Sequence, residues 1–151
     1  MSDNAAGNAK VMIPDLQSSL LCDDVRQEVN GKFILIGLFD VLAVPALPVV
    51  LPRICLVNRW CCGQGEFKQR SRILGADGAS VVIQGQEVPV KLPDSEATAT
   101  CVEFFLNVRI EAEGTYWVEI LLDGDLKLRY PLTARRIKLP PARLPHPSAE
   151  A

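Results

Sequence analysis

The stretch TATCVEFFLNVRIEAEGTYWVEILLDGDLKLRYPLT, residues 98–133, contains three runs in which apolar and polar side chains alternate. The apolar or aromatic side chains fall on even positions: Val102, Phe104, Leu106, Val108, Ile110, Tyr116, Val118, Ile120, Leu122, Leu126, Leu128, Tyr130 and Leu132. A period of two is typical of β-strands with one buried face. Turns that contain Gly114 and Gly124 separate the runs. We therefore expect an antiparallel meander whose even positions seed the core.

The register of this meander is constrained because paired residues must lie on the same face of a sheet. A three-residue loop at positions 112–114 would pair Ile110 with Tyr116. A plain two-residue loop at Asp123 would oppose Leu122 with Asp125, so we expect a three-residue loop or a bulge there. The outer face would then carry three rows: Arg109, Trp117 and Pro131; Asn107, Glu119 and Arg129; Phe105, Leu121 and Lys127.

The remaining sequence continues the β pattern. Further strands are expected at residues 16–22, 32–39, 54–60, 66–74, 80–83 and 87–92, with an extended proline-containing connection at 44–52. The run 32–39 is apolar on both faces, as expected for a central strand of a sandwich. No long segment has helical spacing, so at most one short helix is expected, near Ser95. The sequence predicts an all-β fold: an antiparallel two-sheet β-sandwich, immunoglobulin-like or C2-like, with seven to nine strands.

The length of 151 residues, with 48% hydrophobic and 23% charged residues, suits one globular domain. Residues 1–10 are mostly small and polar, and residues 1–14 are predicted to be a disordered leader. Residues 15–138 form the predicted sandwich domain. Residues 139–151 are rich in proline and are predicted to be a flexible tail.

Several partners and locations are excluded or favoured by composition. A formal net charge of −2 argues against nucleic-acid binding, which draws most of its affinity from a basic surplus. No run of about 20 apolar residues exists, so the sequence predicts no membrane span. Without a signal-peptide pattern, the odd number of five cysteines favours a reducing cytoplasm and free thiols. The vicinal pair Cys61 and Cys62 could be redox-active, although it is not a Cys-x-x-Cys motif.

Catalytic and metal-binding constellations are sparse. The single histidine, His146, lies between prolines in the tail, which disfavours a nucleophile–histidine pair in a rigid core. The cysteines lack zinc-site spacing, and the paired acids fall in predicted turns. We therefore predict no catalytic residue, no metal, no cofactor and no enzymatic activity.

One predicted strand has a chemical pattern. Lys68, Arg70 and Arg72 alternate along residues 66–74, so three cations should share one face at intervals of about 7 Å. Such a row could bind an anionic ligand. The pattern is more typical of a solvated or edge face that prevents sheets from pairing between molecules.

The segments LLCDDVRQEVNGKFILIGLFD and LPRICLVNRW, with the later ADG, resemble an uncharacterised bacterial family of unknown function. The matching positions are Cys22, Asp23, Asp24, Val25, Arg26, Gly31, Lys32, Ile36, Gly37, Leu51 and Pro52. The resemblance covers residues 16–134. It implies a compact β-rich domain and supplies no activity, substrate or site.

Two function classes follow. The first is a non-enzymatic protein-binding or assembly module, meeting a protein partner or itself as a homodimer, through Phe105, Trp117, Leu121 and Arg109 on the outer face. Alternatively, Trp117 lies under Arg109 as a cation–π pair within a monomer. The second class is a small-anion or ligand-binding β-sandwich that uses Lys68, Arg70 and Arg72.

Overall fold

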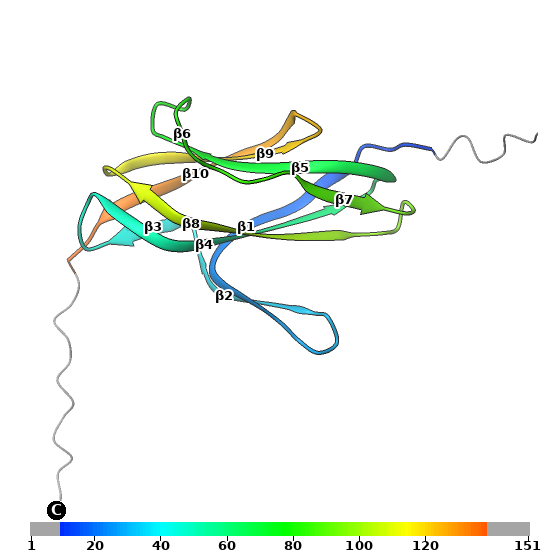
Figure 1. Cartoon of the computed structure of the whole chain (residues 1–151), viewed down its shortest axis with the longest axis horizontal. Helices are drawn as coiled ribbons and strands as arrows, with labels where there is room; N and C mark the ends of the chain where they lie inside the picture. The colour runs from blue at the N-terminus through cyan, green and yellow to red at the C-terminus, as the bar shows by residue number, and fades with distance from the viewer. Residues whose placement is uncertain (1–9, 139–151) are drawn as a thin grey trace, which may run out of the picture.

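The computed structural model describes residues 10–138, which form ten strands and, within that range, no helix. The strands are β1 (Asp15–Gln27), β2 (Phe33–Phe39), β3 (Val41–Val44), β4 (Val49–Cys61), β5 (Gly65–Leu74), β6 (Val81–Gln84), β7 (Val88–Leu92), β8 (Ala99–Ile110), β9 (Gly114–Leu122) and β10 (Asp125–Arg136). They form two sheets packed face to face (Figure 1). The prediction of an all-β, two-sheet sandwich is confirmed.

Each sheet has its own strand order. The four-stranded sheet runs β2-β1-β4-β8 and is antiparallel throughout. The six-stranded sheet runs β3-β10-β9-β5-β6, with β7 also paired to β5. At one edge of this second sheet, β3 pairs with β10 in parallel, which departs from the antiparallel arrangement that we expected.

The number of strands exceeds the seven to nine expected because the proline-containing segment is more ordered than a plain connection. Residues 41–44 pair with β10, and β4 already begins at Val49. Pro45 and Pro48 lie in the bends between β3 and β4. Pro52 lies within β4 at a point where the ladder to β8 is interrupted, as a residue without an amide N–H requires.

The predicted pairing of the first two meander strands is wrong. β8 pairs with β4, whereas β9 pairs with β10 and β5 in the other sheet. The turn at residues 111–113 therefore carries the chain across the core, and Ile110 is not paired with Tyr116. Both side chains are nevertheless buried. Alternating apolar residues place one face of each strand in the core, whether the two strands are neighbours in one sheet or lie in two sheets that face each other.

The buried face of β8 also changes along the strand. Phe105 is 2% exposed, whereas the even-numbered Phe104 and Leu106 are 49% and 58% exposed. Asn107 has a φ of 53°, and beyond it Val108 and Ile110 are buried. The pairing with β4 keeps the same register on both sides of Asn107, so the left-handed residue changes which side chains face the core and not which residues pair. Asparagine tolerates that conformation better than most residues.

The second turn of the meander agrees with the sequence. Asp123 and Gly124 have φ values of 47° and 85° and form a two-residue loop, with Leu122 opposite Asp125. The register then shifts between Leu126 and Leu128, which is the predicted bulge. Beyond the shift, Trp117 pairs with Pro131 and Glu119 with Arg129, as expected.

The main core lies between the two sheets and includes Trp60, Phe105, Ile54, Leu56, Ile73, Ile120 and Leu132. A second, smaller cluster of Cys22, Cys55 and Val57 lies on the opposite face of the four-stranded sheet, where Val25, Leu35 and Val102 pack against it. Met12, within the predicted leader, exchanges two backbone hydrogen bonds with Gln64. The rest of the leader up to residue 9, and the tail from residue 139 with His146, lie outside the described residues.

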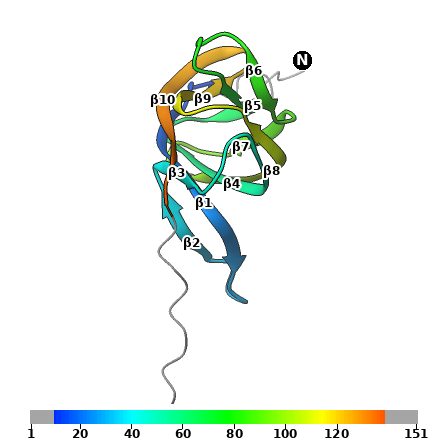
Figure 2. The same cartoon turned by 90° about the vertical axis from the view of Figure 1, so that its left-hand side faces the viewer.

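The hairpin of β1 and β2 extends away from the sandwich (Figure 2). We call residues 24–36 of this hairpin the arm. It departs where Gly37 has a φ of 70° and where the ladder skips the pair Asp23 and Gly37. A Cβ at Gly37 would overlap the Asp23 carboxylate, so only glycine fits this bend.

Candidate interaction surface

The four residues predicted to bind a partner do not form one surface. Phe105 is in the core, so its predicted outer-face position is wrong. Trp117 and Leu121 are half-buried on β9, in the six-stranded sheet. Arg109 lies on β8 in the other sheet, where it is exposed and forms an ion pair with Glu111. The two sheets separate what the predicted register had brought together.

Trp117 has a cation–π partner, but a different one from that expected. The guanidinium carbon of Arg129 lies 4.7 Å from the Trp117 ring centroid. Arg129 also lies 3.7 Å from the buried carboxylate of Glu119. The aromatic face is therefore already covered within the monomer.

Each cation of the basic row on β5 lies near an acid. Arg72 donates to Glu119 Oε1 from Nε at 2.8 Å and from Nη2 at 2.7 Å. Lys68 and Arg70 share Glu87, at 3.8 Å and 4.0 Å. An anion at this row would have to compete with these carboxylates.

The cysteines are free thiols, and the pKa is raised for Cys22, Cys55, Cys61 and Cys101. Burial raises the pKa of Cys22 to about 11, with a smaller contribution from Cys55 opposite it on β4. Burial also raises the pKa of Cys101 to about 11. A hydrogen bond with Cys62 raises the pKa of Cys61. Nucleophilic or redox chemistry at these thiols gains no support, because the thiolate is the reactive form.

A buried polar network inside the core was missed by the sequence analysis. Trp60 Nε1 donates to Gln69 Oε1 at 2.6 Å, and Gln69 Nε2 donates to Glu103 Oε2 at 3.0 Å. Asn58 Nδ2 donates to Ser71 Oγ at 3.1 Å. Burial raises the pKa of Glu103, and no cation pairs with it among the described residues. The network stiffens the core. The burial of Glu103 could have been predicted only by assigning the odd-numbered positions of β8 to the buried face.

The largest concentration of exposed apolar side chains lies on β2, for which no partner site was predicted. Phe33, Ile34, Ile36 and Leu38 are 39%, 44%, 45% and 60% exposed. Among residues 10–138, β2 is an edge strand that pairs only with β1 (Figures 1 and 2). Its sequence FILIGLF has no charged residue to discourage pairing with another strand. The same run was interpreted from the sequence as a central strand.

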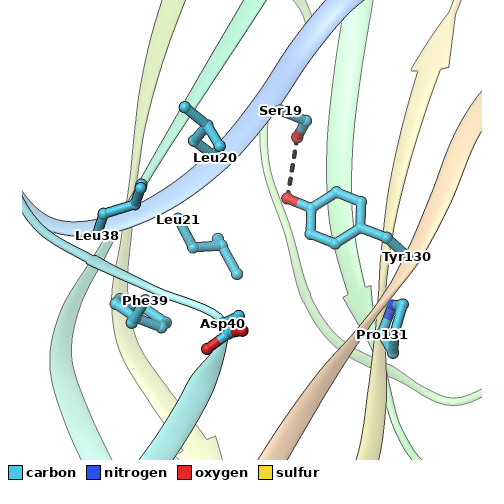
Figure 3. A pocket seen from close by; sticks show the side chains of 8 residues that line it. All are labelled: Ser19, Leu20, Leu21, Leu38, Phe39, Asp40, Tyr130 and Pro131. Carbon is cyan, nitrogen blue, oxygen red and sulfur yellow. Dashed lines mark hydrogen bonds between the residues drawn. The ribbon is translucent and has the colours of Figure 1, made fainter.

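A hollow of about 420 Å³ lies where the middle of β1 and the end of β2 approach β10 (Figure 3). Leu20 and Leu38 project on one side of it and Tyr130 on the other (Figure 3). The Ser19 and Tyr130 hydroxyls are hydrogen-bonded at 2.9 Å. Burial raises the pKa of Tyr130 to about 12, so the phenol stays neutral. The hollow extends the apolar surface of β2 and offers no nucleophile.

Residues 17–135 match a family model described as a family of unknown function, DUF6941. The chain belongs to the DUF6941 family. No curated protein is significantly similar to the chain. Among solved structures, it is similar to Pseudomonas fluorescens alkylpurine DNA glycosylase AlkC bound to DNA containing an abasic site analog, with a TM-score of 0.43 and 12% identity. That match covers 64% of this chain and 28% of the glycosylase chain. We draw no conclusion about function from a likeness of this size.

The described part of this DUF6941 chain supplies few groups for chemistry. No cluster of three metal-ligating side chains occurs within residues 10–138. Over the same range, no helix is long and apolar enough to cross a bilayer. What the DUF6941 domain does offer is an apolar edge strand and the hollows around it.

Proposed function

We propose that the chain is a non-enzymatic assembly module that pairs with a second copy of itself through the free edge of β2. One observation carries the proposal: in the described part of the chain, one edge of β2 has no partner strand, and the apolar side chains of β2 are exposed. An exposed apolar edge offers a row of backbone donors and acceptors to another strand. In a monomer it would be a site of aggregation.

The other sheet edges are less suited to this role. β8, at the far end of the same sheet, lies beside β6 and β7. In the six-stranded sheet, β3 and β6 are only four residues long. Short or covered edges are a common protection against unwanted pairing. β2 is the long edge without such protection.

The sequence of β2 is complementary to itself in the antiparallel sense. A two-fold axis at Ile36 would oppose Ile34 to Leu38 and Phe33 to Phe39 of the partner copy, so that each of these pairs is apolar. A two-fold symmetric interface requires this kind of self-complementarity.

Charges at the ends of the strand fit the same axis. Lys32 would lie opposite Asp40 of the partner copy, and Asp40 opposite its Lys32. Neither residue forms an ion pair within residues 10–138, so both are free to form one between copies. Two opposite-charge pairs would flank the apolar centre and fix its register.

The proposal includes the setting of the protein. The free thiols support a reducing cytoplasm, and the resemblance at Cys22–Arg26 supports a bacterial origin. We place the sandwich in the immunoglobulin-like or C2-like group because its two sheets pack over one core. The anion-binding alternative at Lys68, Arg70 and Arg72 gains less support, because each of these cations already faces an acid.

The test is the mass in solution of the wild type and of Ile36→Lys. The wild type is expected to form a dimer at micromolar concentrations. Ile36→Lys would place two like charges at the axis and is expected to give a monomer with an unchanged circular dichroism spectrum. Leu126→Lys is the matched control, since Leu126 is 52% exposed in the other sheet. A monomeric wild type, or a dimer insensitive to Ile36→Lys, would refute the proposal.

A further inference from the structure

A groove of about 540 Å³ lies between the arm and the outer face of the four-stranded sheet. The arm lies opposite the outer face of this sheet (Figure 1). Residues of both line the groove, so the sheet is its floor and β2 its roof. The volume lies within the usual range of small-molecule sites. Lys32 and Phe33 line the groove and also belong to the segment that the proposed dimer would use.

The floor changes from polar to apolar from one cross-strand row to the next. In the first row, Arg59 of β4 lies between Ser18 of β1 and Thr100 of β8. Neighbours in such a row are about 5 Å apart, so a guanidinium and two hydroxyls can donate to one anion. In the second row, Val57 lies between Leu20 and Val102.

The far end of the groove is closed. The third row contains Cys22 and Cys55, which are both fully buried. Leu35 of the arm packs against this pair from above, and Phe33 lines the roof nearer the mouth. Successive rows on one face of a strand are about 7 Å apart, so the apolar part of the groove is short.

The charge at the mouth has a single sign. Arg59 is exposed and forms no ion pair within residues 10–138, and Lys32 at the rim likewise has none. Of the residues that the structure describes, no acidic one lines the groove. The mouth therefore complements an anion, and the closed end complements a short apolar chain.

We propose that this groove binds a medium-chain amphiphilic carboxylate, with its head group in the Ser18–Arg59–Thr100 row and its apolar chain directed toward Cys22 and Cys55. The planar guanidinium of Arg59 suits a carboxylate because it can donate two parallel hydrogen bonds. Val57 and Leu20 would contact the first methylenes, and Leu35 would cover the chain end.

The experiment measures binding of octanoate and of octanol to the full-length protein by calorimetry, with amide chemical shifts to locate the ligand. Octanoate is expected to bind once per chain and to shift the amides of Ser18 and Thr100. Arg59→Gln should weaken octanoate binding by about tenfold or more, because a charge-assisted hydrogen bond is lost. Octanol, which has no carboxylate, should bind the wild type no more tightly than octanoate binds Arg59→Gln.

Two controls separate the groove from general attraction. Arg135→Gln removes another exposed arginine without an ion pair, on β10, and should leave octanoate binding unchanged. Along a series of longer carboxylates, affinity should rise by about fourfold per methylene and then level off when the chain reaches Cys22 and Cys55. Absence of octanoate binding, an unchanged affinity in Arg59→Gln, or equal binding of octanol would overturn the inference.

Discussion

The two adjacent phenylalanines of β8 give a direct test of the register. Phe105 is 2% exposed in the core, and Phe104 is 49% exposed on the opposite face. Removing a buried phenylalanine ring typically costs about 3–5 kcal/mol of unfolding free energy, because the cavity closes only partly. Removing the Phe104 ring loses partial burial and its contact with Arg53, whose guanidinium carbon is 5.6 Å from the ring centroid. That loss should be about 1 kcal/mol.

Urea denaturation of Phe105→Ala and Phe104→Ala at neutral pH measures both costs. Phe105→Ala should lower the midpoint by about 2 M, since small domains lose about 1–3 kcal/mol of stability per molar urea. Phe104→Ala should lower it by well under 1 M on the same scale. If Phe105→Ala does not fold, Phe105→Leu and Phe104→Leu give the same comparison with smaller losses. Equal costs, or a larger cost at Phe104, would contradict the register and favour the even-numbered face.

Three further predictions concern other parts of the sandwich. Burial raises the pKa of Glu103 in the folded state. The stability that its protonated form contributes is therefore present below the unfolded-state pKa and is lost as the pH rises through the folded-state pKa. Glu103→Gln should remove this loss in urea titrations across pH; a parallel pH dependence in both proteins would refute it. Gly37→Ala should lower the melting temperature and loosen the arm, seen as faster amide exchange, because its Cβ would overlap Asp23. Glu119→Gln should cost about 1–3 kcal/mol in urea denaturation by weakening its bonds to Arg72, and a neutral effect would count against that ion pair.

Local turn chemistry could be predicted from the sequence. The Asp123–Gly124 turn and the bulge beyond it followed from the rule that paired residues share a face, and the pair Glu119 and Arg129 followed with them. Alternation also identified β9 as a strand with one buried face. These features depend on contacts between neighbours in the chain.

The assignment of strands to sheets could not be predicted by the same rule. Ile110 and Tyr116 are both buried whether β8 and β9 are neighbours or face each other across the core. The left-handed Asn107 reverses the exposed face of β8 without any break in its apolar pattern. This reversal put Phe105 in the core and removed it from the predicted partner site.

The apolar run of β2 was misinterpreted for a related reason. A strand that is apolar on both faces is typical of the centre of a sandwich. Here Gly37 turns the hairpin away from the sheet, and the same residues become an exposed edge. A run such as FILIGLF therefore fits a buried strand or a strand that is buried only on assembly.

The most direct test of the assembly proposal is sedimentation of three charge variants beside the wild type. Lys32→Asp and Asp40→Lys alone should each weaken the dimer by about tenfold or more, because like charges would oppose each other twice across the axis. The double variant carrying both changes should restore dimerisation to near the wild-type level, because each pair then has its charges exchanged. A double variant no tighter than either single variant would contradict pairing through β2 about Ile36.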